Sequence, residues 1–275
     1  MHETHLSQSL RPTGEDKYLV PGLIRGLQVL QAFTPESREM SLSEIARRVG
    51  TTRSAAFRTV YTLAHQGYLL HNPESGRYTL GPAVLRLGYG YLATRELLEI
   101  ALPELERLRD ATDWSTHLGV RDGRFVLYML RVPSRMGLAS IVHVGSRLPA
   151  AGTTMGRVLL AGLSEQDLVR LYRDETYHNA PGQTPRSLAE LVDQWRRDRG
   201  AEAITQIGSF ESGIVSIAAP VRDIEGNVVA AINATQAASS GNIESIDGPV
   251  REEVLRCAAA ITRMLGGRPE GAPGR

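Results

Sequence analysis

The sequence predicts a mixed α/β protein of two domains, a small and mainly helical one followed by a larger α+β domain. Three observations carry this prediction. A chain of 275 residues is long for one hydrophobic core. Apolar residues recur at helical spacing in the N-terminal part, whereas beyond residue 114 short extended runs alternate with helical segments. These runs come in pairs joined by turn residues, which favours a central antiparallel sheet over a βαβ nucleotide fold.

The composition is that of a soluble globular protein. Apolar residues make up 42% and charged residues 22% of the chain, and no apolar run approaches the roughly 20 residues that a membrane-spanning helix needs. The polar segment 1–17 lacks the apolar stretch of a secretory signal and is expected to be disordered. The single cysteine, Cys257, excludes an internal disulfide framework and fits a reducing compartment. We therefore expect a cytoplasmic protein with no membrane partner.

The first domain begins with three predicted helices. In the first, apolar residues recur at helical spacing from Leu23 to Phe33, with Pro21 placed to start the helix and Thr34-Pro35 to end it. The second is capped by Ser41 or Ser43 and ends at a glycine, and the third is capped by Thr52 or Ser54. A glycine-containing turn between two such helices is typical of a helix-turn-helix unit.

A predicted β-hairpin follows the helices. Two extended runs, at 68–71 and 77–80, flank the turn-forming sequence Asn-Pro-Glu-Ser-Gly. Three helices followed by a hairpin are the layout of a winged helix-turn-helix domain.

Basic residues concentrate on the second and third of these helices. From residue 40 to 60 the chain has four arginines and one acidic residue, although its formal net charge is only +1. Arg53, Ser54 and Arg58 share the face of the third helix that lies opposite its apolar stripe. A recognition helix needs this division, because its polar residues reach base edges and phosphates while its apolar residues pack on the domain. The predicted interface with double-stranded DNA consists of Thr52, Arg53, Ser54, Arg58 and, in the hairpin, Arg77. The alternative is a solvated basic face on a small helical bundle.

The remaining elements are predicted from periodicity and turn signals. The Leu-rich segment 85–109, with Pro103 interrupting it, indicates a linker helix followed by the first helix of the second domain. Strands are predicted at 116–120, 125–132, 138–144, 214–221 and 228–235. Helices are predicted at 154–162, 164–173, 187–199 and 246–265.

Several segments resemble the IclR family of bacterial transcriptional regulators. In the first domain they are GLIRGLQVLQAF (22–33), SLSEIARRVG (41–50), GYL (67–69) and YTLG (78–81). In the second they are RLPAAGTTMGRVLLAGL (147–163) and ESGIVSIAAPVRDIEGNVVAAINAT (211–235). The resemblance covers about residues 21–265. It departs at Ala55, where the family usually has threonine, so a hydroxyl contact to DNA is not expected there.

The resemblance implies a ligand-responsive regulator with an effector-binding second domain of GAF/PAS-like α+β architecture. The implied organisation is a disordered N-terminus at 1–17, a winged helix-turn-helix domain at 18–81, a linker helix at 82–98, an effector-binding domain at 99–266 and a flexible tail at 267–275. The segments look closest to the branch that controls aromatic-acid catabolism, such as the protocatechuate and 4-hydroxybenzoate regulators. A small carboxylic acid is therefore the expected effector.

The implied effector site joins a turn to two strands. A glycine-threonine turn that opens a helix presents free N–H groups and the positive end of the helix dipole, which suits a carboxylate. Carried over position by position, the effector-binding residues are Gly152, Thr153, Thr154, Met155, Gln206, Ser216, Asn233 and Thr235. The candidate apolar walls are Leu118, Tyr128, Leu130, Leu138 and Ile214, and Arg131 is a candidate to offset a ligand's charge.

Strand periodicity supports part of this set independently. Asn233 and Thr235 are two residues apart, so both side chains lie on one face of their strand. Buried polar side chains need partners. The alternative is that these residues bond one another or buried water, or lie on a solvated face.

The sequence offers little for two other classes of function. For a hydrolase or metal enzyme the sequence offers only scattered histidines, His117, His143 and His178, with no metal, nucleophile or phosphate motif. Cys257 lies on the apolar face of the last predicted helix, which indicates a buried side chain and not a nucleophile. A small-molecule-binding or protein-binding module without operator specificity would need no basic helix. We expect no enzyme activity, no cofactor and no metal.

The expected mechanism couples two sites in an oligomer. A homodimer, or a dimer of dimers, would place paired recognition helices in successive major grooves of a pseudo-palindromic operator. Residues 85–98 are the candidate self-associating helix. The effector would act through unequal affinity for two arrangements of the DNA-binding domains, and this coupling can have either sign, as an activator or a repressor.

Overall fold

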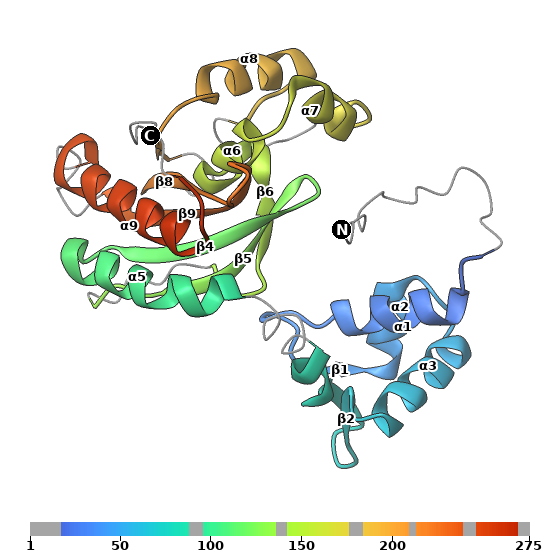
Figure 1. Ribbon diagram of the computed structural model, residues 1–275. Coiled ribbons are helices and arrows are strands. Elements are labelled where there is room, and N and C mark those ends of the chain that lie inside the picture. The colour runs from blue at the N-terminus through green and yellow to red at the C-terminus, as the bar shows by residue number, and fades with distance from the viewer. Residues whose placement is uncertain are drawn as a thin grey trace. The chain divides into compact units, whose positions relative to one another are not determined.

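The computed structural model describes residues 18–87, 96–135, 142–175, 184–208, 213–238 and 246–268 (Figure 1). The chain divides into two compact units, residues 1–94 and 95–275. Several predicted features lie outside the described residues: the N-terminus at 1–17, positions 88–95 of the linker helix, and positions 269–275 of the tail.

The first unit has the predicted three helices and hairpin. Its helices are α1 (Pro21–Gln31), α2 (Leu42–Val49) and α3 (Arg53–His65), and its strands are β1 (Met40–Ser41), β2 (Leu69–Asn72) and β3 (Arg77–Leu80). The hairpin β2–β3 is extended to a three-stranded sheet because Met40 pairs with Tyr78. The strand β1 was not predicted, since a strand of two residues has no periodicity.

The helix boundaries of this unit follow from local hydrogen bonding. Of the two proposed caps for α2, Ser41 is used: its hydroxyl accepts from Glu44 N at 3.3 Å, and Glu44 Oε2 accepts from Ser41 N at 2.7 Å. The helix ends at Gly50, whose φ of +70° suits glycine. At α3 the cap is Thr52, whose hydroxyl accepts from Ala55 N at 3.3 Å. The connection between α2 and α3 is therefore short and fixed at both ends.

The second unit contains a six-stranded antiparallel sheet in the order β6-β5-β4-β9-β8-β7. Its strands are β4 (Ser115–Asp122), β5 (Phe125–Val132), β6 (Arg147–Pro149), β7 (Ile204–Ile207), β8 (Ile214–Arg222) and β9 (Val228–Ala237). The two predicted pairs, β4–β5 and β8–β9, are present. The short edge strands β6 and β7 were not predicted. Of the strand predicted at 138–144, residues 138–141 lie outside the described part, and residues 142–144 are not in a strand.

Helices cover both faces of this sheet (Figure 1). They are α5 (Glu96–Thr112), α6 (Thr154–Ala161), α7 (Glu165–Tyr172), α8 (Leu188–Asp198) and α9 (Arg251–Met264), with short turns η1 (Ala150–Gly152) and η4 (Ile246–Val250). The helices α5 and α9 pack together on one face, and α6 packs on the other, where it joins α7 and α8 in the main hydrophobic core. The residues that α6 covers are therefore separated by the sheet from those that α5 and α9 cover.

Two helix predictions need correction at prolines. Pro103 does not interrupt the helix but lies inside α5. Because proline lacks an N–H, the helical hydrogen bond from position 103 to the carbonyl of Glu99 is not formed. The last helix was predicted from residue 246, but α9 begins at Arg251, because Gly248 has a non-helical backbone and Pro249 follows it.

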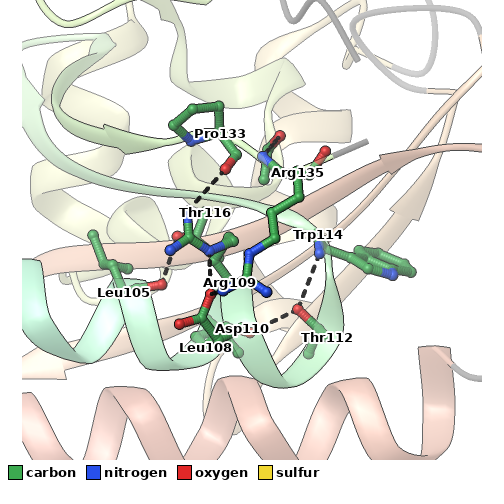
Figure 2. A network of polar contacts seen from close by, with 11 residues as sticks. Leu105, Leu108, Arg109, Asp110, Thr112, Trp114, Thr116, Pro133 and Arg135 are labelled. Atoms are coloured by element: carbon green, nitrogen blue, oxygen red, sulfur yellow. Dashed lines mark hydrogen bonds and ion pairs between the residues drawn. The ribbon is translucent and has the colours of Figure 1, made fainter. Parts of the chain in front are cut away.

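A polar network anchors the C-terminal end of α5 to β4 and to the end of β5 (Figure 2). Arg109 Nη1 donates to the carbonyl oxygen of Pro133 at 3.3 Å, and Arg109 Nε donates to the Asp110 carboxylate at 2.6 Å. The Thr116 hydroxyl donates to the carbonyl oxygen of Leu105 at 3.0 Å. Thr116 thus faces α5, and its neighbours along β4 point to the opposite face, toward α6.

Candidate functional site

The helix α3 divides its residues as the sequence predicted. Ala56 and Val60 are fully buried, whereas Arg53, Ser54 and Arg58 are exposed. The Thr52 hydroxyl, besides capping the helix, lies 3.3 Å from the Ser54 hydroxyl. The basic outer face therefore belongs to a helix that its apolar residues hold on the unit.

Two aromatic residues on the same outer face were missed by the sequence analysis. Phe57 and Tyr61 are 49% and 64% exposed, and their ring centroids lie 6.0 Å apart. One turn separates them, and they alternate with the exposed polar residues along the helix. The signal was available, since two aromatic side chains outside the apolar stripe of a helix have no core to enter.

Arg77, the predicted contact in the hairpin, is engaged within its own unit. Its Nη2 lies 3.0 Å from Glu44 Oε2 and donates to the carbonyl oxygen of Glu39 at 3.2 Å. The pKa of Glu44 is lowered, chiefly by its hydrogen bonds from Ser41 and further by the charge of Arg77. These contacts tie the hairpin to the start of α2, and a contact between Arg77 and DNA stays a prediction.

In the second unit, polar side chains lie on the sheet face that α6 covers, and five of them, one from each of five strands, run across the sheet. In the order of the strands from β7 to β5 they are Gln206, Ser216, Asn233, His117 and Arg131. Gln206 pairs with Ser216, and His117 pairs with both Asn233 and Arg131 in the strand register. Gln206, Ser216, Asn233 and His117 are buried, with exposures of 1–8%. We call these five residues the polar row.

Hydrogen bonds join most members of the polar row. The Thr154 hydroxyl, at the start of α6, donates to Gln206 Oε1 at 3.0 Å. Asn233 Nδ2 donates to the Ser216 hydroxyl at 3.2 Å, and Asn233 Oδ1 lies 2.9 Å from His117 Nδ1. Because an amide oxygen only accepts, the proton of the neutral His117 ring is on Nδ1. The hydrogen bond therefore leaves Nε2 as an acceptor.

His117 is held neutral by its surroundings. Burial, with a smaller contribution from the nearby charge of Arg131, lowers its pKa from 6.5 to about 4, against the opposing effect of its hydrogen bond to Asn233. The ring also meets Tyr128 edge to face, with centroids 5.6 Å apart. In the structure as described, His117 Nε2 and Arg131 Nε are both buried without a hydrogen-bond partner.

The predicted glycine-threonine turn opens α6 beside the polar row. The Thr153 hydroxyl caps the helix by accepting from Gly156 N at 3.2 Å, and it donates to the carbonyl oxygen of Pro149. The first-turn N–H groups of Thr154 and Met155 have no acceptor within the helix. Both residues are buried, so these donors face the interior of the unit and not solvent.

The structure brings most predicted effector residues together. Thr154, Gln206, Ser216 and Asn233 are linked through hydrogen bonds or strand pairing, and Gly152 directly precedes Thr153 in the turn. Thr235 lies on the same face opposite Ser216, but its hydroxyl donates to the carbonyl oxygen of Ser115. The alternative was that these side chains bond one another or buried water. Asn233 and Ser216 do bond one another, whereas His117 Nε2 and Arg131 Nε have no protein partner in the described residues.

Two of the predicted apolar walls lie on the wrong face of the sheet. Leu118 alternates with His117 and pairs with Leu130, so both face α5 and α9. Tyr128 nevertheless lies with His117, because a β-bulge shifts the register between Leu118 and Gly119. Ile214 lies on the same face as Ser216, and Leu138 lies outside the described residues. A single sequence does not reveal such a bulge.

The described residues offer no second kind of site. Among the described residues no group of three His, Cys, Asp or Glu side chains could hold a metal ion. Cys257 is a buried thiol whose pKa is raised by burial. Within the same residues, none of the helices has the length and apolar character to span a membrane.

Comparison with known proteins relates both units to one family. The family model for the bacterial transcriptional regulator IclR C-terminal matches residues 89–263, and that for the IclR helix-turn-helix domain matches residues 22–73. The Pca regulon regulatory protein of Pseudomonas putida is 33% identical over 230 residues, which are 80% of this chain and 75% of that protein. The HTH-type transcriptional regulator XynR of Escherichia coli is 27% identical over 248 residues, 90% of this chain and 98% of that protein.

Solved structures give the same relation. An IclR homolog from Microbacterium hydrocarbonoxydans, complexed with 4-hydroxybenzoate, is similar with a TM-score of 0.74 and 26% identity. The match covers 89% of this chain and 98% of that one. The two family models together extend over most of the chain. The helix-turn-helix model matches the first unit, and the C-terminal model matches the unit that contains the six-stranded sheet. The chain therefore belongs to the IclR family of bacterial transcriptional regulators.

Proposed function

We propose that this protein binds a DNA operator through α3 and that a small aromatic carboxylic acid, bound in the second unit, modulates this binding. The observation that carries the proposal is the exposed basic face of α3, which is held on the first unit by fully buried apolar residues. Such a helix can present hydrogen-bond donors to a major groove while its apolar face stays packed on the first unit.

Within the DNA interface the residues have different roles. Arg58 lies one turn after the helix start, where a guanidinium reaches the edge of a guanine or two phosphate oxygens. Arg53 and Ser54 stand at the helix entrance, beside the capping Thr52, and suit phosphate contacts. The hairpin arginine, Arg77, contributes charge from a fixed position on β3. In the proposed homodimer, or dimer of dimers, each copy of α3 contacts one half of a pseudo-palindromic operator through these residues.

The effector site uses the start of α6 and the polar row. The carboxylate of the ligand is bound by the N–H groups of Thr154 and Met155, at the positive end of the α6 dipole. Gln206, Ser216 and Asn233 supply polar contacts along the sheet face, and Tyr128 an apolar one. The structural relative that holds 4-hydroxybenzoate supports an aromatic acid as the ligand class.

The regulatory step is a difference in affinity and not a reaction. A ligand changes operator binding only as far as it binds two arrangements of the protein unequally. The domain assignment that we propose is 18–81 for DNA binding, 82–98 for the linker helix and 99–266 for effector binding. A cytoplasmic location and the absence of enzyme activity complete the proposal.

The experiment that tests this function is operator binding at physiological salt. Purified protein should shift the intergenic fragment upstream of its gene in preference to a random fragment of equal length, and 4-hydroxybenzoate should change that affinity. Equal affinity for both fragments, with and without the acid, would reject the proposed function. Operator specificity with no response to any carboxylic acid would reject only the effector class.

A further inference from the structure

Two unpaired polar atoms lie on facing residues of the effector-binding unit. Three buried side-chain atoms lack a hydrogen-bond partner in its described part: His117 Nε2, Arg131 Nε and Ser134 Oγ. His117 and Arg131 are opposite each other on β4 and β5, where Cβ atoms are separated by about 4.5–5.5 Å. Ser134 lies just after β5. Native proteins rarely leave buried polar groups unpaired, so the first two atoms together indicate a missing partner.

The two atoms require opposite kinds of partner. The neutral His117 ring has its proton on Nδ1, toward Asn233, so its Nε2 needs a donor. The Nε–H of Arg131 needs an acceptor. A carboxylate would satisfy Arg131 but leave Nε2 without a proton to accept. A hydroxyl group satisfies both, because it donates one hydrogen and accepts through its lone pairs.

We propose that His117 and Arg131 recognise a hydroxyl group of the effector. The hydroxyl donates to His117 Nε2 and accepts from Arg131 Nε–H, while the ligand's carboxylate lies at the start of α6. The effector is therefore a hydroxylated aromatic acid. His117 and Arg131 make the protein bind this acid more tightly than the same acid without the hydroxyl. This inference rests on the effector site proposed above.

The groups around His117 keep its ring neutral, which the proposed contact with a hydroxyl requires. The charge of Arg131 and burial both oppose protonation of the ring, so Nε2 remains an acceptor. Asn233 is fixed in turn by its bond to the Ser216 hydroxyl, which holds its oxygen toward His117.

The test compares two acids that differ by one hydroxyl. Binding of 4-hydroxybenzoate and benzoate to the full-length protein is measured by calorimetry, and the ratio of the two dissociation constants is the readout. We expect the wild-type protein to prefer 4-hydroxybenzoate by roughly tenfold or more, because benzoate leaves the buried donor and acceptor without a ligand partner.

Two substitutions remove the proposed contacts. His117→Asn keeps an amide near the position of Nδ1, toward Asn233, but deletes Nε2, and Arg131→Met keeps an unbranched apolar stem but deletes the donor. Each should bring the ratio close to one, mainly by weakening 4-hydroxybenzoate. His65→Asn, at an exposed histidine in the other unit, is the matched control and should keep the wild-type ratio. Cooperative thermal unfolding of each variant shows that it is folded.

A second measurement needs no variant. The ¹⁵N resonance of His117 Nε2 should move when 4-hydroxybenzoate is added and should move much less with benzoate. Equal wild-type affinity for the two acids, or a preference that survives both substitutions, would overturn the inference while leaving the proposed effector class intact. If the wild-type protein binds neither acid, the aromatic effector class and this inference are both rejected.

Discussion

Acidification should destabilise the second unit through His117. In the folded protein burial lowers the pKa of this ring to about 4, whereas in the unfolded chain it returns to about 6.5. Above pH ~6.5 the ring is neutral in both states and contributes no pH dependence. Below that pH the unfolded chain takes up a proton that the folded protein refuses, so the free energy of unfolding falls until the folded ring is protonated as well.

The magnitude follows from the two pKa values. Their difference corresponds to a total of ~3 kcal/mol at pH values below both. Between about pH 7 and about pH 4.5 the expected loss is ~2 kcal/mol, because the folded ring begins to protonate near the lower end of that range. This is a sizeable part of the stability of a typical domain.

Tryptophan fluorescence isolates this unit from the other. Both tryptophans of the chain, Trp114 and Trp195, are in the second unit and almost fully buried. Urea unfolding is followed at several pH values for the wild-type protein and for His117→Asn, which has no titrating ring at this position. The variant's pH dependence should be weaker by ~2 kcal/mol over the stated range. Parallel curves for the two proteins would show that His117 is not held neutral, and would refute the reasoning.

Three further substitutions test the DNA interface, the polar row and the packing of α6. Arg58→Ala should weaken operator binding by about 1–3 kcal/mol in a gel-shift titration. The control Arg170→Ala, at an exposed arginine of the second unit, should bind the operator like the wild-type protein. If Arg58→Ala also binds with wild-type affinity, Arg58 is not part of the interface. Asn233→Leu should abolish the response of operator binding to 4-hydroxybenzoate. It should also destabilise the second unit by about 2–4 kcal/mol, because His117 and Ser216 lose their hydrogen bonds to Asn233. A normal response to 4-hydroxybenzoate would count against the proposed site. Gly156→Ala should destabilise by a few kcal/mol in thermal unfolding, because its Cβ would lie 2.1 Å from the carbonyl oxygen of Ala150; an unchanged melting temperature would contradict this close approach.

The sequence predicted the DNA-binding unit better than the sheet unit, for a physical reason. Its contacts are local: caps such as Ser41 and Thr52, the glycine turn and the hairpin are each specified within a few residues. The outer and inner faces of α3 follow from helical periodicity alone. The strand β1 was missed because its pairing with β3 joins residues far apart in the chain.

The effector-binding unit was predicted in part. The paired strands and the face shared by Asn233 and Thr235 follow from alternation. Which strands are neighbours does not, since β4 and β9 are separated by more than 100 residues of sequence. The β-bulge that moves Tyr128 to the face of His117 has no signature in alternation, and it separates Tyr128 from Leu130, which alternation alone places on one face.

The pairing of β4 with β9 explains how one site can bind the carboxylate of an acid and also discriminate between acids by their hydroxyl group. Residues at the start of α6 and on β8 and β9 belong to the family's two signature segments in the second domain, and in our proposal they lie toward the carboxylate end of the ligand. His117 and Arg131 come from a separate hairpin and reach the same face only because β4 pairs with β9 at the centre of the sheet. A hairpin that contacts the ligand at one hydroxyl can change while the carboxylate site is kept. We therefore expect differences in effector preference between IclR-family proteins to arise on β4 and β5 more than at the start of α6.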